Sequence, residues 1–452
     1  FVANIHGFPA NPVTGEPLEP EDQKVSPADR NTFWSTCQHA SEFFLPWHRA
    51  ELLMFERMVR EFSGDPKFAL PYWDAFANPK LPEAFRLATV DGKPNPLRIE
   101  DRGFGVNDGT TQVGQLPPGF GVPNALLAAN YRGPRPNGFG GRGKHPNMTG
   151  RVKGFLESPA HDHVHGSLGG LMGDPDTAGR DPIFYLHHAN IDRLWTVWRQ
   201  NAKHVNPSDA WLKEPVVMPS HQALPEVTFA AKGLVDTVAL GYRYDNEQTA
   251  SGPGTATTST APQVPAAPPV RLRGRSVDPG PGPATAGAPQ TFSRTDEALS
   301  LGADSVSVEL PLPAAAGKSI IARAGGPQAA GIQQLEVVLR GLTAPSNPGV
   351  SYFVYVNLPE SARATGNAGA HFLGLLNSWE IKQAGRHAKT EDAEVRFSIV
   401  DRLAELLKEK LLDPSQLRLA FIRSGLVSND GTPIPLPQQT YVNVRQIAVE
   451  AR

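Results

Sequence analysis

Cysteine, blocks of basic residues and long apolar runs are all scarce in this sequence. Cys37 is the only cysteine among 452 residues, so no internal disulfide can form and nothing requires an oxidising compartment. No apolar run approaches the length of about 20 residues that crosses a bilayer. With a net charge of −2 and no long basic block, the chain offers no obvious surface to nucleic acid or anionic lipid. We therefore expect neither nucleic acid nor a membrane as a partner.

The composition changes after residue 248, and 452 residues exceed what one core usually holds. Residues 1–248 contain eleven of the thirteen histidines. Residues 249–290 are mostly Gly, Pro, Ala, Thr and Ser, which bury too little apolar surface to hold a fixed structure. Residues 291–452 contain short apolar runs such as SVSVEL and YFVYVNL, separated by turn residues. We predict a histidine-rich domain, a linker, and an antiparallel β-sandwich or barrel over these three ranges.

Three histidines alternate in the segment HDHVHG. Ser158 is a suitable N-cap and Pro159 suits the first helical position, so the segment is predicted to be helical. His165 comes four positions after His161, which places both on one helical face, whereas His163 points away. Two neutral imidazoles one turn apart can bind a metal ion. The alternative is a pair of surface histidines.

Two further segments place histidines on amphipathic helices. In LPWHRAELLMFERMVREF, His48 lies where the apolar stripe of the predicted helix begins. In DPIFYLHHANIDRLWTVW, His188 shares the buried face with Ile191 and Trp195. His187 is turned about 100° away from it, which favours a structural role for His187.

Together these histidines predict a metal centre inside a bundle of helices. Five of the thirteen histidines lie between positions 161 and 188. No carboxylate has the HExxH spacing of a zinc hydrolase, and no cysteine cluster suggests structural zinc or iron–sulfur. Imidazole ligands suit copper, zinc, iron or nickel, so the residues alone leave the metal open.

The two longest histidine motifs are recognisable. HASEFFLPWHRAELLMFE and DPIFYLHHANID resemble both signatures of the type 3 copper proteins, the family of tyrosinases, catechol oxidases and molluscan-type haemocyanins. LPYWD and GYRYD also look like this family, whose catalytic domain ends near such a tyrosine pair. The resemblance covers residues 1–245. More loosely, VVLRGL, YFVYVN and HFLGLL resemble, in that order, the C-terminal β domain of plant polyphenol oxidases and haemocyanins.

The resemblance implies a mostly helical catalytic domain built around two copper ions, each held by three imidazoles. The histidines that match the family's ligands are His6, His39 and His48 for copper A, and His161, His165 and His188 for copper B. The implied activity is that of a polyphenol oxidase, which uses O2 to convert mono- or o-diphenols to o-quinones. Its partners would be a small phenolic substrate and O2.

Two residues near these histidines acquire roles through the same resemblance. Cys37 stands two positions before His39, as in fungal members that join such a cysteine to the histidine by a thioether. The alternative is a small buried hydrophobic residue. Glu157 matches a glutamate that holds a water near the coppers in plant members, and we predict that it accepts the phenol's proton through that water. The alternative role for Glu157 is capping a helix start.

Two positions depart from the plant pattern. Asp162 stands where an asparagine usually follows the first copper B histidine, and an ionised aspartate only accepts hydrogen bonds. The water would then be a weaker or differently tuned base, or Asp162 would take up the proton itself. The alternative is that the negative charge of Asp162 only stabilises the first turn of the helix. Pro175 matches a bulky phenylalanine that overhangs copper A, so we expect Pro175 to leave the substrate gate less obstructed.

Several alternatives stay open. An oxygen carrier would have the same six histidines, permanently covered by the C-terminal domain. An oxidase of aminophenols or of a biosynthetic intermediate would differ only in its substrate. A zinc or structural metal protein would share the same helices. We expect the β domain to keep the enzyme latent, without a blocking residue to name. The first residue is not a methionine and no signal-like segment follows it, so we expect N-terminal residues to be missing. Compartment, oligomeric state, natural substrate and monophenolase versus diphenolase activity are left open.

Overall fold

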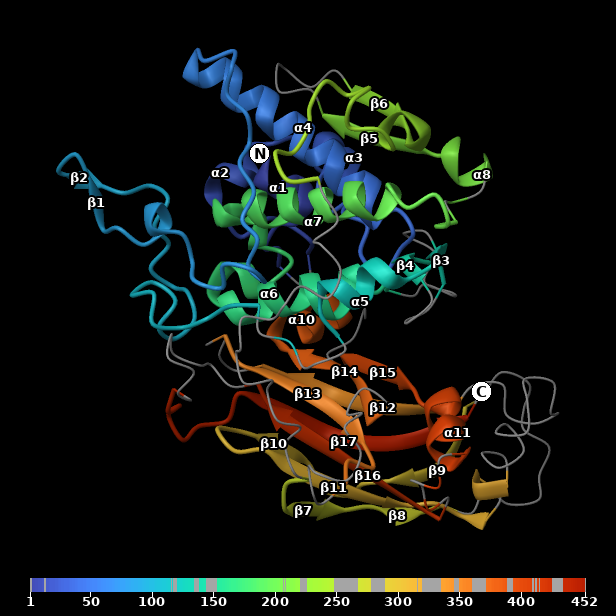
Figure 1. Ribbon diagram of the computed structural model, residues 1–452. Helices are drawn as coiled ribbons and strands as arrows, with labels where there is room; N and C mark the ends of the chain where they lie inside the picture. The colour runs from blue at the N-terminus through green and yellow to red at the C-terminus, as the bar shows by residue number, and fades with distance from the viewer. Residues whose placement is uncertain are drawn as a thin grey trace. The chain divides into compact units, whose positions relative to one another are not determined.

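The computed structural model describes residues 2–451 except 12–13, 115, 117–119, 134–137, 144–152, 206, 208, 220–225, 248–266, 278–288, 315, 319–334, 345–348, 360–370, 388–392, 409, 411–412, 414 and 425–433. It divides into two compact units (Figure 1). The first comprises Phe1–Leu116 with Phe120–Thr258, and the second Pro117–Gly119 with Ser259–Arg452. No helix of the described part is both long enough and apolar enough to cross a bilayer.

The first unit is built on two long amphipathic helices that pack against each other, α4 (Phe44–Ser63) and α7 (Ile183–Arg199). In Figure 1 they lie side by side in blue and green. The α4 helix ends at Gly64, whose φ of 69° is the left-handed conformation that glycine adopts without strain. At the start of α7, Asp181 Oδ1 accepts a hydrogen bond from the amide of Ile183 at 3.2 Å, which satisfies an otherwise unpaired donor.

A short helical segment carries the HDHVHG histidines. The π-helical turn η2 (Leu156–His161) continues directly into α6 (Asp162–Leu168). Inside η2 the backbone of Ser158 is extended, with φ −129° and ψ 124°, as at the residue that precedes a helix. The regular helical turns that hold His161 and His165 therefore begin after Ser158.

The remaining elements of the first unit are short and surround the long helices. They are α1 (Ala3–His6), α2 (Pro20–Gln23), α3 (Pro27–Phe33), η1 (Glu83–Phe85), α5 (Val122–Leu127), η3 (Gly170–Gly173), η4 (Ala178–Arg180), α8 (Asp209–Leu212), η5 (Ala231–Leu234), and the strand pairs β1 (Thr89–Val90) with β2 (Lys93–Pro94), β3 (Asn130–Arg132) with β4 (Gly138–Gly141), and β5 (Pro215–Pro219) with β6 (Glu226–Ala230).

A buried ion pair joins the two long helices. Arg49 Nε of α4 donates to Asp192 Oδ1 of α7 at 2.5 Å, and both side chains are buried. The guanidinium also lies 4.0 Å from the ring centroid of Trp195. The second oxygen of Asp192 accepts hydrogen bonds from the hydroxyls of Tyr242 and Tyr244, both at 2.7 Å. The tyrosine pair of GYRYD thus fastens the late part of the first unit onto α7.

The second unit contains two sheets. The six-stranded sheet has the order β15-β12-β17-β9-β8 with β10 beside β17, and the five-stranded sheet has the order β14-β13-β16-β11-β7. The bounds are β7 (Val270–Arg273), β8 (Arg275–Ser276), β9 (Gln290–Arg294), β10 (Leu299–Leu301), β11 (Val306–Pro311), β12 (Leu335–Thr343), β13 (Ser351–Val356), β14 (Phe372–Asn377), β15 (Glu394–Ser398), β16 (Gln416–Arg423) and β17 (Val442–Ala451), with helices α10 (Ser378–His387) and α11 (Val400–Lys408).

Side chains from both sheets share one apolar cluster. Val337 and Ile447 of the six-stranded sheet and Val354 and Phe421 of the five-stranded sheet are completely buried in it. Neither strand order closes on itself among the described residues, so the barrel alternative is wrong. The strand pairs among the described residues of 291–452 are antiparallel, as predicted. The parallel pairing of β7 with β11 brings in a strand from the predicted linker.

Part of the predicted linker is ordered in strands. β7 and β8 lie within residues 249–290, and Leu272 of β7 packs against the apolar cluster. The physical reason is the alternation in VRLR, which turns Val270 and Leu272 to one face of a strand and both arginines to the other. The linker prediction is therefore wrong for these strands. Residues 249–266 and 278–288 lie outside the described residues, and the predicted domain boundaries stay predictions.

Candidate metal centre

Seven buried histidines form two clusters in the first unit. The first cluster is His6, His39 and His48, and the second is His161, His165, His187 and His188. Within each cluster, one ring nitrogen of every member lies within 4.8 Å of the others. The structure brings together all six histidines that the resemblance selects and adds His187 to them.

The two clusters are neighbours because α4 packs on α7. The rings of His48 and His188 stack with centroids 4.4 Å apart and planes 8° apart. The rings of His39 and His161 are 5.7 Å apart. His39 lies in the loop before α4, so residues distant in sequence meet at one point. The centre can therefore hold two metal ions close to each other.

Backbone carbonyls fix the protonation of three imidazoles. Nδ1 lies within hydrogen-bond distance of a carbonyl oxygen in His6 with Pro175 (3.0 Å), His48 with Phe44 (2.7 Å) and His165 with Met172 (2.8 Å). A carbonyl oxygen only accepts, so each Nδ1 carries the proton and each Nε2 keeps a lone pair for a metal. The Nε2 atoms of His165 and His188 lie 3.3 Å apart, aimed at a common region.

A carboxylate holds the ring of His161 instead. Asp162 Oδ1 lies 2.9 Å from His161 Nδ1, and Asp162 Oδ2 lies 2.9 Å from the ammonium of Lys153. Each oxygen of Asp162 therefore faces a hydrogen-bond donor. Lys153 carries no signal in the sequence, because nothing in a loop lysine nine positions before Asp162 shows where its side chain points.

Burial keeps the histidines of the centre neutral. The pKa of His48 and that of His187 fall to about 3, chiefly because burial penalises the charged ring. The pKa values of His161, His165 and His188 lie well below the ordinary value, first through burial and then through neighbouring histidines. Neutral imidazoles are the form that binds metal ions, so the centre is prepared for them near pH 7.

Cys37 contacts the ring of His39, and Glu157 contacts the residue that follows it. Oε1 of Glu157 accepts a hydrogen bond from the amide of Ala40 at 2.6 Å, and the Glu157 side chain is buried. Sγ of Cys37 lies 3.3 Å from Nδ1 of His39, and Cys37 is buried as well. These positions suit the roles that the resemblance implies, and both roles stay predictions.

Pro175 has a contact that the sequence analysis does not anticipate. Its carbonyl oxygen is the acceptor for His6 Nδ1, and Pro175 is itself buried. Pro175 therefore orients His6 through its backbone, which is a different role from the one expected at the substrate gate. The predicted effect of Pro175 on access stays a prediction.

His163 and His187 have different surroundings. His163 belongs to neither cluster, and its ring nitrogens lie 3.3 and 3.4 Å from the hydroxyl of Ser167. This placement agrees with the helical periodicity. His187 stacks on His161, with ring centroids 5.3 Å apart, and is a further candidate ligand that the sequence analysis assigns to a structural role.

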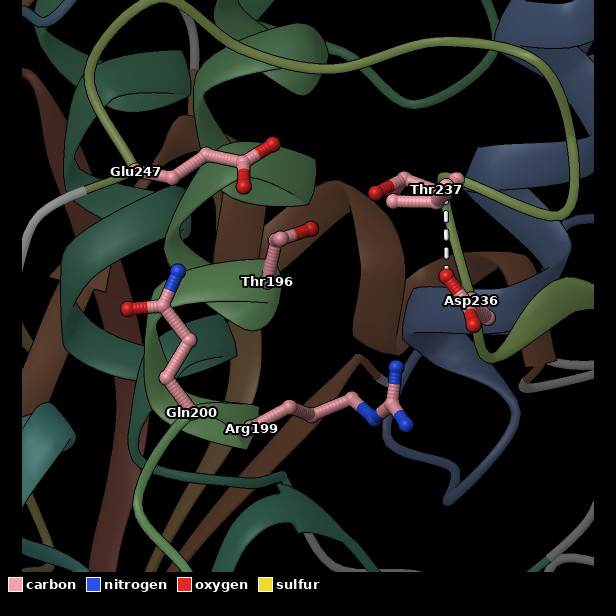
Figure 2. Close-up of a pocket in the computed structure, with 7 residues that line it drawn as sticks. Thr196, Arg199, Gln200, Asp236, Thr237 and Glu247 are labelled. Carbon is pink, nitrogen blue, oxygen red and sulfur yellow. Dashed lines mark hydrogen bonds between the residues drawn. The ribbon is translucent and has the colours of Figure 1, made fainter.

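A separate pocket of about 170 Å³ lies along α7 and the segment that follows residue 235 (Figure 2). Its lining residues are Thr196, Arg199, Gln200, Asp236, Thr237, Val238 and Glu247. None of them is a histidine of either cluster. Figure 2 shows that the lining includes the guanidinium of Arg199 and the carboxylates of Asp236 and Glu247. This pocket is not a candidate for the metal centre.

Comparison with known proteins gives an independent result. Residues 1–119 and 128–201 match the family model described as the common central domain of tyrosinase. Tyrosinase HcTyr1 of Hahella sp. (strain CCB-MM4) is 33% identical over 304 residues, which are 58% of this chain and 58% of the relative. (+)-Larreatricin hydroxylase, chloroplastic, of Larrea tridentata is 30% identical over 226 residues, which are 46% of this chain and 38% of the relative.

The solved structure of latent apple tyrosinase is 19% identical to this chain, with a TM-score of 0.47 over 92% of this chain and 84% of that one. The chain spans less than two thirds of the length of the two curated relatives above, at 58% and 38%. Residues 1–119 and 128–201 therefore carry the common central domain of tyrosinase, and the chain is similar to tyrosinases over that part.

Proposed function

We propose that this protein is a dicopper oxidase that uses O2 to convert mono- or o-diphenols to o-quinones. The observation that carries the proposal is the pair of adjacent, buried histidine clusters, joined where His48 stacks on His188 at 4.4 Å. Neutral, all-imidazole donors suit copper, and two copper ions are the cofactor of this family. When bound, the copper pair supplies the two-electron chemistry that couples oxidation of the phenol to reduction of O2.

The proposed ligands are three histidines for each copper ion, His6, His39 and His48 for copper A, and His161, His165 and His188 for copper B. His188 is preferred to His187 because its Nε2 lies 3.3 Å from that of His165 and its ring stacks on His48. The geometry thus supports a role for His188 at the junction of the clusters. His187 then supports the ring of His161 by stacking on it.

Glu157 is the proposed proton acceptor. A phenol has an unperturbed pKa near 10, so it must lose its proton to a positioned base before it is oxidised. Glu157 is buried, lies four positions before His161, and is tied to the residue after His39. It therefore stands between the segments of both clusters, where a water could pass the proton to it.

Cys37 and His39 are the proposed thioether pair, supported by the 3.3 Å contact. Formation of the bond would remove the thiol hydrogen and one ring C–H hydrogen, and the two electrons would pass to O2. The link would fix the His39 ring and so lower the entropy lost when copper A binds.

For the second unit we propose a two-sheet sandwich, supported by the apolar cluster that the six- and five-stranded sheets share. We also propose that this unit keeps the enzyme latent, which the order of the units and the family resemblance support. An oxygen carrier would instead bind O2 without turning over catechol, even after proteolysis within residues 249–266.

Oxygen consumption tests the function directly. The full chain, loaded with copper, is supplied with tyramine or catechol before and after limited proteolysis. We expect uptake of O2 with catechol, increased by cleavage. Reversible O2 binding without quinone, in intact and cleaved protein alike, would identify a carrier and refute the oxidase.

A further inference from the structure

We propose that Lys153 is a positioning residue for copper B, acting on His161 through Asp162. The proposal rests on the proposed function in one respect, since it takes His161 as a copper ligand. It adds a residue from outside the histidine motifs. It also predicts that a charged carboxylate orients one ligand of copper B, whereas backbone carbonyls orient ligands of copper A.

The three side chains form a continuous chain of hydrogen bonds. The ammonium of Lys153 lies 2.9 Å from Asp162 Oδ2, and Asp162 Oδ1 lies 2.9 Å from His161 Nδ1. The side chains of Asp162 and His161 are 0% exposed, and that of Lys153 is 15% exposed. Lys153 comes from the segment before η2, whereas Asp162 begins α6, so the chain joins two separate segments.

Burial explains why a lysine is required. A carboxylate removed from water is very unfavourable unless it is paired and hydrogen-bonded. Lys153 supplies the opposite charge, which allows a charged acceptor to lie beside the His161 ring. An Asp162–His161 contact alone would leave one carboxylate oxygen without its cation.

The charged acceptor distinguishes His161 from the other oriented histidines. His6, His48 and His165 each direct Nδ1 to a neutral carbonyl oxygen. A carboxylate draws the Nδ1 proton more strongly, which fixes the ring and makes Nε2 a better donor to a metal ion. Copper B is therefore the ion whose binding depends on the Lys153–Asp162 pair.

Replacement of Lys153 should selectively weaken the binding of copper B. Lys153→Met keeps most of the apolar stem but removes the ammonium, whereas Lys153→Arg keeps the positive charge. Loss of a supporting group next to a metal ligand typically lowers metal affinity about 10- to 100-fold. We expect that loss for one of the two copper ions in Lys153→Met and near-normal binding in Lys153→Arg.

The experiment is a copper titration of the full chain against a competing chelator, with wild type and both variants. Lys93→Met, at an exposed position of β2, is the matched control. Copper B is identified in a His39→Ala background, where the copper A site lacks a ligand, and copper A in a His165→Ala background. Lys153→Met should weaken binding in the first background only.

A second arm separates support of the ligand from general damage to the fold. Asp162→Asn keeps an oxygen that can accept from His161 but no longer needs a cation. Adding Lys153→Met to Asp162→Asn should therefore cause little further loss of copper affinity. This double variant stays informative if Lys153→Met alone fails to fold.

Three results would overturn the inference: unchanged copper binding in Lys153→Met, equal weakening of both ions, or no rescue by Lys153→Arg. These outcomes differ from failure of the proposed function. A wild-type chain that binds two copper ions and oxidises catechol, with Lys153→Met unaffected, would refute only the role of Lys153. A wild-type chain that does not bind two copper ions would refute the function itself.

Discussion

One carboxylate oxygen of Glu157 accepts a hydrogen bond from the backbone amide of Ala40 at 2.6 Å, although the two residues are 117 positions apart. Ala40 directly follows His39 and has a left-handed φ of 48°, a conformation that costs a non-glycine residue about 1–2 kcal/mol. Glu157 therefore helps to hold the turn that presents His39. His161, four positions after Glu157, belongs to the other cluster, so Glu157 connects the segments of the two clusters.

This contact separates two roles of Glu157. Glu157→Gln keeps an oxygen for the Ala40 amide but removes the charged base, so we expect normal copper content and at least a 100-fold loss of monophenol turnover, about the size of a general-base effect. Catechol turnover should fall far less. Glu157→Ala also removes this acceptor of the Ala40 amide, at a cost of about 1–3 kcal/mol in stability. Steady-state rates on both substrates, copper analysis and thermal unfolding measure these effects; equal losses on the two substrates in Glu157→Gln would rule out the proton-transfer role.

The Arg49–Asp192 pair should dominate the stability of the first unit. Asp192→Ala leaves a buried guanidinium without its carboxylate and the hydroxyls of Tyr242 and Tyr244 without their acceptor. Breaking such a pair from one side costs about 3–5 kcal/mol, which urea unfolding can measure. Glu100→Ala, at the pair that Arg98 makes with the exposed Glu100, is the control, and it should change little because surface pairs contribute little. Similar effects of both substitutions would contradict the prediction.

The metal-free protein should lose stability as pH falls below the ordinary histidine pKa. Burial lowers the pKa of His48 and that of His187 to about 3, so between about pH 6.5 and 3 the unfolded chain binds protons that the folded chain does not. Stability is then complete above the unfolded pKa and declines below it. Each of these histidines should lower the free energy of unfolding by about 1.4 kcal/mol between pH 7.5 and 5.5. His187→Phe should remove one such contribution; a pH-independent free energy of unfolding would show that the histidines are not buried in neutral form.

The proposed thioether would leave a mass signature. After copper loading and exposure to O2, the intact chain should be lighter by two hydrogen atoms and should no longer react with thiol reagents under denaturing conditions. Peptide mapping should place the link between Cys37 and His39, which lie 3.3 Å apart through Sγ and Nδ1. Cys37→Ala should keep the unmodified mass of its own sequence. A free Cys37 thiol after many turnovers would remove the thioether from the site.

Periodicity in the sequence was sufficient where the site lies on regular helices. The four-residue spacing of His161 and His165 predicts a shared face, and both lie in the second cluster while His163 does not. The apolar stripe that includes Trp195 likewise turns His188 inward. These inferences depend only on local geometry.

Contacts between distant segments were beyond such reasoning. Lys153 reaches Asp162 from a loop, and the Pro175 carbonyl reaches His6 across 169 positions, so neither contact leaves a local pattern. His39 was placed among the ligands through family resemblance, since its loop has no periodicity to read. In the second unit, strand β7 could not be predicted because two apolar residues in a Pro- and Gly-rich stretch are a weak strand signal. Its pairing with β11 is a tertiary contact that the local sequence does not show.

Copper content and quinone formation, measured together in wild type and in His188→Ala, test the dicopper centre most directly. His163→Ala is the matched control, because His163 is buried but belongs to neither cluster. Two copper ions per chain with quinone formation are expected in wild type and in the control, and one copper ion without quinone in His188→Ala. A wild-type chain that retains a single copper ion, or a His188→Ala variant that still forms quinone, would contradict the centre described above.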